Sequence, residues 1–364
     1  MVEMEPEVAL RLFEDGATII FLDVPVTTEI GIDFQSWNTA EKFKGIKMIP
    51  PGVHYIYYSA VSKERQTAPR TGFFHYFHKK EVLVRRWHAD EEDLIDSVGA
   101  EEKERLASNL KELDGNLGAY PYDSWKRWVS LSDKLTESII ARLEPKSKKI
   151  SSVVELVPEQ FHSEAKKKRR TLRGELEDSM LPAMQPRPGT ELNFTSIPDR
   201  YPANASASEV TRYSLDSSYV LQQLLIKWET PRQLLGEIQM AFLCFIVGQV
   251  YTAFEQWKKL LHIACTADEM LVKEPQFFLD LIGDLYFQMQ EVPSDFFVDI
   301  VSQDNFLTQT LRLFFSNVLD NQLTDKRLEK RCVQLQRYLT QRFEWDFDAE
   351  AEEDAPVIVE LPDV

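Results

Sequence analysis

Short hydrophobic runs dominate the first quarter of the chain. Runs rich in Ile, Val, Phe and Tyr occupy residues 17–24, 52–61, 71–77 and 81–87, with Gly, Pro and polar clusters between them. Such runs are typical of β-strands. Pro and Gly within residues 49–52 are placed as a tight turn requires. The pattern predicts a small β-sandwich or barrel at the N-terminal end.

The spacing of hydrophobic residues then becomes helical. Residues 100–142 show this spacing, broken by glycines and a proline within 115–122, which predicts short helices attached to the β-rich unit. A second helical region runs from Ser208, taken as a cap, to residue 343. Inside it, Thr230 followed by Pro231 is typical of a helix start.

These patterns predict an α+β protein with two domains and an extended C-terminal tail. The N-terminal domain is expected to be β-sandwich-like with short helices, and the C-terminal domain to be all-α. The expected boundaries are 1–145 for the β-rich domain, 146–207 for a partly mobile linker, 208–345 for the helical domain and 346–364 for an acidic tail that ends in a β-strand. A length of 364 residues fits two cores better than one.

The net charge of −17 argues against a protein that mainly binds nucleic acid, because phosphate binding depends on clustered Lys and Arg. The charge is also unevenly distributed. Residues 146–173 carry nine Lys or Arg against three Glu, whereas residues 344–364 carry nine acids and no base. The basic run Lys166 to Arg170 is typical both of a nuclear-import signal and of a solvated linker.

The cysteines and the apolar stretches indicate a reducing compartment and no membrane span. Three widely separated cysteines predict neither a disulfide framework nor a zinc site. The longest apolar stretch, Met240 to Gly248, is about half of the roughly 20 residues that cross a bilayer. The acidic N-terminal segment lacks the uninterrupted apolar run of a secretory signal.

Catalytic signatures are absent from the sequence, so no enzyme activity, cofactor or metal is expected. No phosphate-binding, dinucleotide-binding or serine-hydrolase motif occurs. His75 and His78 face opposite sides of a predicted strand and are interpreted as structural or surface residues. Asp295 and Asp299 would share a helix face, which keeps a carboxylate hydrolase as a third hypothesis, but Asp295 behind Ser294 is more simply a helix-capping feature.

A weak repeat supports an alternative class of function. One triplet of residues recurs 35 positions later in the chain, as Gly248, Tyr251 and Phe254 and then Gly283, Tyr286 and Met289. This period is near that of tetratricopeptide arrays, which need at least three copies. The alternative function is therefore a tetratricopeptide-like adaptor that binds partner proteins in a helical groove around Tyr251 and Tyr286.

The last residues of the chain form a candidate binding strand. Two prolines enclose five residues of strand character, Val357, Ile358, Val359, Glu360 and Leu361. Seven acids between residues 344 and 354 come just before them. Two interpretations stay open: the strand folds onto the edge of the chain's own β-domain, or it adds to a sheet edge in another protein, where alternate side chains give specificity.

Five long blocks resemble one known family, the a1-alpha2 repression (Aar-two) family of splicing factors. They are residues 31–59, beginning "GIDFQSWNTAEKF", residues 113–131, "LDGNLGAYPYDSWKRWVSL", residues 234–261, beginning "LLGEIQMAFLCF", residues 292–311, "VPSDFFVDIVSQDNFLTQTL", and residues 343–362, ending "APVIVELP". The resemblance runs from the first strand to the tail and is weakest over residues 145–185.

The resemblance implies a non-enzymatic assembly chaperone of the U5 small nuclear ribonucleoprotein. Members of the family bind the RNase H-like and Jab/MPN-like domains of the largest U5 scaffold protein and hold it in a cytoplasmic precursor. They compete with the U5 helicase, which replaces them after nuclear import, and phosphorylation is associated with them. For this chain the resemblance implies a cytoplasmic protein with possible nuclear shuttling, whose strand from Val357 to Leu361 bridges the two scaffold domains and whose binding blocks early RNA contact.

Overall fold

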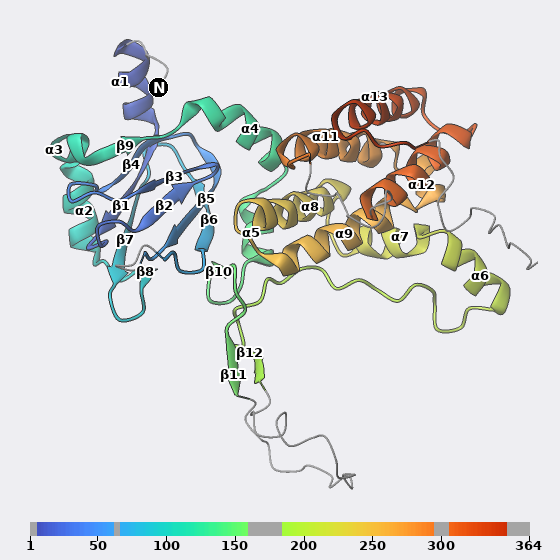
Figure 1. Ribbon diagram of the computed structural model, residues 1–364, viewed down its shortest axis with the longest axis horizontal. Helices are drawn as coiled ribbons and strands as arrows, with labels where there is room; N and C mark the ends of the chain where they lie inside the picture. Colours follow the sequence, from blue (N-terminus) through green and yellow to red (C-terminus); the bar gives the residue numbers. More distant parts are fainter. Residues whose placement is uncertain (1–5, 62–65, 159–183, 295–305, 348–364) are drawn as a thin grey trace, which may run out of the picture.

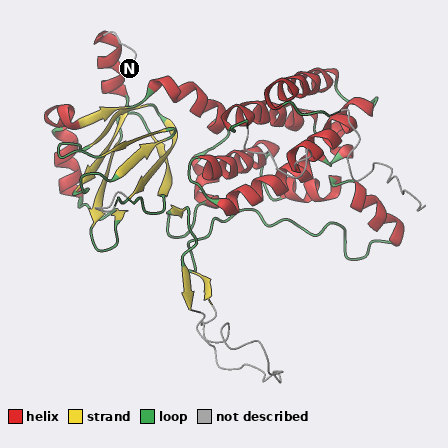
Figure 2. Ribbon diagram, in the orientation of Figure 1, coloured by secondary structure: helices red, strands yellow, loops and turns green. Residues whose placement is uncertain are grey.

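A computed structural model of the chain describes residues 6–61, 66–158, 184–294 and 306–347. Figure 1 shows a β-rich domain at one end of the molecule, a helical domain at the other, and a thin two-stranded ribbon that projects from the junction between them. The secondary-structure view in Figure 2 shows the same division, with the sheets and a few short helices at one end and the long helices at the other. The α+β class with a β-rich N-terminal and a helical C-terminal domain is therefore confirmed.

Among the residues that the structure describes, the N-terminal domain contains two five-stranded sheets. Sheet A contains, in spatial order, β8 (Asp93–Ile95), β7 (Val82–His88), β1 (Ala17–Leu22), β4 (Gly45–Ile49) and β9 (Leu117–Ala119). Sheet B contains β10 (Ile150–Ser151), β6 (Thr71–Phe77), β5 (Gly52–Ser59), β2 (Glu29–Ile32) and β3 (Gln35–Asn38). Sheet B is antiparallel throughout, whereas β1 pairs with β7 and β4 pairs with β9 in parallel.

Strand β5 of sheet B is buried on both faces, and its sequence shows why. Its side chains alternate between two cores: Ile56 and Tyr58 pack toward sheet A, whereas Tyr55 and Tyr57 pack toward the helical domain. Both faces therefore need apolar side chains, and β5 is a nearly continuous hydrophobic run rather than an alternating one.

Short helices cover the outer face of sheet A. The segment before β1 forms α1 (Pro6–Asp15), and the segment after β8 forms α2 (Ala100–Ser108), α3 (Leu110–Leu113) and the single turn η1 (Asp114–Asn116). Leu106 and Leu113 from this segment pack against Ile20 and Val84 of sheet A. The layers are thus α2 and α3, sheet A, sheet B and then the helical domain (Figure 1).

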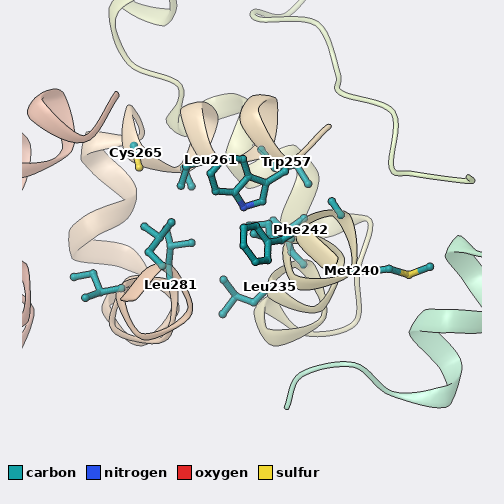
Figure 3. Close-up of a cluster of buried hydrophobic side chains, with 14 of the residues drawn as sticks. Leu235, Met240, Phe242, Trp257, Leu261, Cys265 and Leu281 are labelled. Atoms are coloured by element: carbon teal, nitrogen blue, oxygen red, sulfur yellow. The ribbon is translucent and has the colours of Figure 1, made fainter. Parts of the chain in front are cut away.

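The helical domain is built around α8 (Pro231–Ile246), whose central residues are all buried. Its described helices are α4 (Tyr122–Ser132), α5 (Glu137–Leu143), α6 (Ala207–Leu215), α7 (Ser218–Ile226), α8, α9 (Tyr251–Cys265), α10 (Asp268–Lys273), α11 (Pro275–Glu291), α12 (Phe306–Asp320) and α13 (Lys326–Phe343). Every residue of α8 from Leu234 to Cys244 is buried. Figure 3 shows Leu235 and Phe242 of α8 gathered with Trp257 and Leu261 of α9 in this core.

The helix starts follow capping chemistry, with one correction to the prediction. Thr230 precedes α8, and its backbone N–H donates to the side chain of Gln233 at 3.2 Å, so the predicted start at Pro231 is confirmed. Helix α6 begins at Ala207, not at Ser208. Its cap is Ser206, because the Glu209 carboxylate accepts from the Ser206 backbone and completes a capping box that Ser208 cannot form.

Part of the segment expected to be a linker pairs with the domain before it. Ile150 and Ser151 form β10 at the edge of sheet B, and β11 (Leu156–Pro158) pairs with β12 (Met184–Pro186) in the projecting ribbon.

The three cysteines are all free and buried. Burial raises the pKa of each thiol, that of Cys332 to about 12. Within the described ranges, no helix combines the length and apolar character needed to cross a membrane.

Candidate partner-binding site at the domain junction and the base of the tail

The predicted binding strand, Val357 to Leu361, lies outside the described residues. The same holds for the basic run Lys166 to Arg170 and for Asp295 and Asp299. The candidate site is therefore built from the described residues that hold the base of the tail and from those that join the two domains.

The base of the tail is fixed to helix α12. Helix α13 ends where Glu344 adopts a left-handed conformation with φ of 59°, which turns the chain back. The ring of Phe347 then packs against Phe315 of α12 with centroids 4.9 Å apart, and the guanidinium of Arg312 donates to the Asp346 carbonyl at 3.1 Å. Trp345 stacks on Phe343 at 4.6 Å. The chain is thus held in place up to Phe347.

Helix α4 connects the domains through one buried tryptophan. Trp128 is 1% exposed, and its indole N–H donates to the Val53 carbonyl of β5 at 2.6 Å. The Phe34 ring at the turn between β2 and β3 meets the Trp128 ring edge-on at 5.8 Å. Because Trp128 packs in the same core as α8 and α11, sheet B and the helical domain share one hydrophobic core.

A buried polar cluster fixes the turn that carries Phe34. Asp33 has φ of 54°, and one of its carboxylate oxygens contacts His54 Nδ1 at 2.7 Å and accepts from the Tyr120 hydroxyl at 2.7 Å. The other oxygen accepts from the Tyr55 backbone N–H at 3.0 Å. Burial, followed by the Asp33 charge, raises the pKa of Tyr120, so this hydroxyl stays a hydrogen-bond donor. The left-handed turn is therefore held by β5 and by the residue that follows β9.

A second buried cluster joins the end of α4 to helices α8 and α11. Lys134 follows α4, and its ammonium group donates to an Asp284 oxygen of α11 at 2.5 Å. Gln239 of α8 donates to the same oxygen at 3.0 Å and to Asp133 at 2.7 Å, and its own oxygen accepts from the Lys134 backbone at 3.0 Å. Lys134 and Asp284 are 7% and 3% exposed, so the pair is shielded from water.

The Asp284 carboxyl is expected to make stability fall as the pH rises. Its second oxygen is buried without a hydrogen-bond partner in the described structure. Burial outweighs the nearby Lys134 charge and raises the pKa of Asp284 to about 7, against about 3.9 in an unfolded chain. The folded state therefore binds the proton more tightly, so this stabilisation is complete below pH 4 and is lost as the pH rises through 7.

The measurement is the free energy of unfolding of the wild type and of Asp284→Asn at pH 5 and pH 7.5. The difference between the two proteins should change by about 2 kcal/mol in favour of the variant as the pH rises, because Asn cannot ionise. Parallel pH profiles would show that the Asp284 carboxyl does not titrate in this range.

Two arginines complete the junction at its rims. Arg70 of the β-domain donates to the Val247 carbonyl at the end of α8 at 2.7 Å, and its guanidinium lies 4.2 Å from the Tyr57 ring centre. Arg127 of α4 lies 4.9 Å from the Phe34 ring centre and forms an ion pair with Glu291 at the end of α11. Contacts on both rims oppose any rotation of one domain against the other.

Exposed apolar side chains lie over this junction on α4 and α11. The pairs Lys134 with Asp284 and Arg127 with Glu291 show that the two helices run antiparallel. Trp125 and Val129 are exposed on α4, and Tyr286 and Phe287 are exposed on α11. Exposed aromatic and aliphatic groups on two packed helices are candidates for a partner-binding surface.

Tyr251 and Tyr286, expected to line the groove of a tetratricopeptide-like adaptor, lie in different surroundings. Gly248 lies in the turn before α9, whereas Gly283 lies inside α11, so the two triplets are not equivalent positions of a repeat. Tyr251 lines a groove at the domain junction to which Tyr286 does not contribute. Tyr286 packs against Tyr338 of α13, with ring centres 4.8 Å apart.

The two histidines singled out in the sequence, His75 and His78, are accounted for by hydrogen bonds. His75 Nε2 and the His78 backbone both bond to the Glu81 carboxylate, at 2.7 and 2.8 Å. This fits the prediction that both histidines are structural. In the ranges that the structure covers, no group of three His, Cys, Asp or Glu side chains is placed to hold a metal ion.

Sequence reasoning missed the Lys134 and Asp284 pair and the Asp33, His54 and Tyr120 cluster. Lys134 and Asp284 are 150 positions apart, and neither lies in a recognisable motif. Glycine at position 236 was the available signal, because a side chain there would meet the Lys134 carbonyl at 2.8 Å and Ile139 at 2.6 Å. A glycine in the middle of a buried helix indicates close approach of another segment.

Comparison with known proteins shows similarity over both domains. The model for the AAR2 N-terminal domain matches residues 15–145, and the model for the AAR2 C-terminal repeat region matches residues 194–348. The human "Protein AAR2 homolog" is 42% identical over 377 aligned positions, which cover 100% of this chain and 98% of the human protein. The chain belongs to the AAR2 family.

Similarity within the AAR2 family extends across distant organisms. The "Protein AAR2 homolog" of Caenorhabditis elegans is 38% identical over 95% of this chain and 99% of its own length. The yeast "A1 cistron-splicing factor AAR2" is 23% identical over 87% of this chain and 88% of its own length. The AAR2 N-terminal region contains strands β1 to β9 of the β-rich domain together with α4 and α5, and the AAR2 C-terminal region contains helices α6 to α13.

Proposed function

We propose that the protein is a splicing factor without catalytic activity that acts as an assembly chaperone of the U5 small nuclear ribonucleoprotein. The observation that carries this proposal is similarity over nearly the full length to AAR2 proteins, one of which is named as a splicing factor. Its partner is the largest U5 scaffold protein, bound through the RNase H-like and Jab/MPN-like domains. Binding occurs in a cytoplasmic precursor, before import to the nucleus.

The proposed mechanism joins a fixed body to a binding strand. The described chain ends at Phe347 against α12, on the side of the helical domain that faces away from the sandwich (Figure 1). Val357 lies ten positions later, so the strand can reach at most about 35 Å from this anchor. An anchor remote from the chain's own sheets supports strand addition to a partner rather than to its own β-domain.

Anchoring raises the local concentration of the strand at the partner. Once the junction surface around Trp125 and Phe287 contacts one scaffold domain, the tether holds Val357 to Leu361 close to a second domain, and the second contact becomes intramolecular. Main-chain hydrogen bonds supply affinity, and Val357, Val359 and Leu361 supply specificity. The bound surfaces then exclude RNA and the U5 helicase until the protein leaves.

Removal of the strand is expected to abolish joint binding of the two scaffold domains. The test is a quantitative pull-down of the RNase H-like and Jab/MPN-like domains by the intact chain and by a chain that ends at Asp354. Joint binding should fall about a hundredfold, equivalent to about 2.7 kcal/mol. A chain that ends at Pro362 keeps the strand and serves as the matched control, with binding unchanged.

The same assay separates the proposed function from the adaptor alternative. An adaptor that uses helical surfaces should lose binding in Tyr251→Ala or Tyr286→Ala and tolerate truncation after Asp354. Equal binding of both domains by the intact and the truncated chain would contradict the bridging mechanism. The interface would then have to lie on the helical domain.

A further inference from the structure

A groove of about 940 Å³ lies between the sandwich and the helical domain, at the root of the projecting ribbon. Its walls come from the turn between β7 and β8, from residues 149–155, from residues 186–194 and from the start of α9. Figure 1 shows β10, β11 and β12 together at this junction. Both domains contribute residues to the groove, so it forms only where the two domains pack together.

One wall of the groove is an open edge of sheet B. Strand β10 pairs with β6 on one side, through Ile150 with Gly72 and Ser151 with Thr71. On its other side β10 has no strand partner among the residues that the structure describes. The Ser152 backbone N–H donates to the Arg70 carbonyl at 2.8 Å, which extends the pairing by one residue. The backbone groups beside β10 are held by serine hydroxyls: Ser147 bonds to the Lys149 N–H at 3.4 Å and to its carbonyl at 3.3 Å, and Ser151 accepts from the Val153 N–H at 3.3 Å. An added strand would displace these two hydroxyls and take their place at the edge.

The groove carries unneutralised negative charge. Its two basic residues are already paired, Lys149 with Asp93 and Arg187 with Glu155. Three exposed acids that line the groove make no ion pair with any described residue, namely Glu91, Glu92 and Glu191. A concave surface with an excess of one charge attracts ligands of the opposite charge and repels phosphate groups.

Exposed apolar groups lie beside these acids. Val153 and Val154 follow β10 and are 53% and 49% exposed, and Tyr251 at the start of α9 is 66% exposed. All three line the groove. An aromatic ring and aliphatic side chains next to carboxylates match the hydrocarbon stem and the cationic end of Lys or Arg.

We infer that the groove binds an extended segment of a partner protein rich in Lys or Arg, added as a strand to β10. The chain's own tail is excluded as the occupant, because residues 344–364 carry nine acids and no base. The groove is therefore a second protein-binding site, separate from the strand of the tail and of opposite charge preference. Alternate side chains of the bound segment face Glu91 and Glu92, and the others face Val153 and Tyr251.

The test uses the full chain and a fluorescein-labelled synthetic peptide of alternating Lys and Val, six residues long, with binding followed by fluorescence anisotropy. Two triple variants change the net charge equally. The groove variant combines Glu91→Gln, Glu92→Gln and Glu191→Gln. The control combines Glu101→Gln, Glu104→Gln and Glu112→Gln, at exposed positions on α2 and α3 that make no ion pair with a described residue. The groove variant should bind at least tenfold more weakly, and the control less than twofold.

A second peptide tests strand addition itself. Methylation of alternate backbone nitrogens keeps the charge of the peptide and removes its strand hydrogen bonds, so binding should fall at least tenfold. Two results would overturn the inference: an equal loss of peptide affinity in the two triple variants, or no effect of methylation on binding. Either would show that the peptide is held only by the overall net charge of −17 and not by the groove. Tighter binding after Lys166 to Arg170 are replaced by Ser would also overturn the inference, because the chain's own basic run would then be the occupant.

Binding of the basic peptide in the groove is independent of bridging by the tail strand, so the two can be tested separately. Truncation after Asp354 should leave binding of the basic peptide unchanged, because the tail does not line the groove. The groove variant should likewise leave bridging by the strand at Val357 to Leu361 intact. Loss of peptide binding on truncation would contradict the assignment of the peptide to the groove.

Discussion

Replacement of Lys134 by Met is expected to lower the free energy of unfolding by about 3 kcal/mol at pH 7.5. The substitution keeps the volume of the side chain and removes its charge. Asp284 then remains buried with Gln239 as its hydrogen-bond partner. A buried carboxylate without its counter-ion is costly because it has lost its hydration shell. The cost should be smaller at pH 5, because loss of the Lys134 charge raises the pKa of Asp284 further and the carboxyl is then protonated.

Two further proteins make this measurement decisive. The double variant Lys134→Met with Asp284→Leu removes both charges and should recover stability to within about 1 kcal/mol of the wild type. Lys126→Met, at an exposed position of α4, removes an equal charge and should change stability by less than about 0.5 kcal/mol. Urea unfolding followed by circular dichroism gives all four values. A loss below about 1 kcal/mol in Lys134→Met at pH 7.5 would contradict the expected role of the pair.

Replacement of Trp128 by Ala is expected to cost about 3 to 5 kcal/mol, because it leaves a cavity in the core that the two domains share. It also leaves the Val53 carbonyl of β5 without its donor. Trp128→Phe keeps most of the apolar contact and removes only the indole N–H, so it should cost about 1 to 2 kcal/mol.

The control for Trp128 lies on the same helix. Trp125 is 38% exposed, and Trp125→Ala should change stability by less than about 0.5 kcal/mol. Differential scanning calorimetry of the intact chain also tests whether the shared core couples the domains. A single transition in the wild type that splits in two in Trp128→Ala is the expected result. Equal effects of Trp125→Ala and Trp128→Ala would show that burial of Trp128 does not join the domains.

The junction matters for function because it fixes the surfaces that partners meet. The groove beside β10 takes Glu91 from the sandwich and Tyr251 from the helical domain. The tail, in turn, starts from Phe347 on α12. Loosening the core around Trp128 would change the distance between these features. We therefore expect variants of the junction to weaken partner binding even where each domain still folds.

Local sequence pattern was a good guide where an element is long enough for its own side chains to carry the pattern. The four long hydrophobic runs of the first quarter became β1, β5, β6 and β7, and Thr230 with Pro231 became the start of α8. The pattern did not show β3, whose four residues are all exposed, or β9 and β10, which are two or three residues long. Short exposed strands exist only because a neighbouring strand pairs with them, and their own side chains carry little periodic signal.

The sequence by itself determined the class of the fold and, through long matching blocks, the family. Periodicity and capping are local properties, so they can be read along the chain. Only the tertiary structure decided that Lys134 meets Asp284, that Trp128 reaches Val53, and that β10 leaves an open edge beside Glu91. Such contacts join residues far apart in sequence, and their strength depends on burial and charge that exist only after packing.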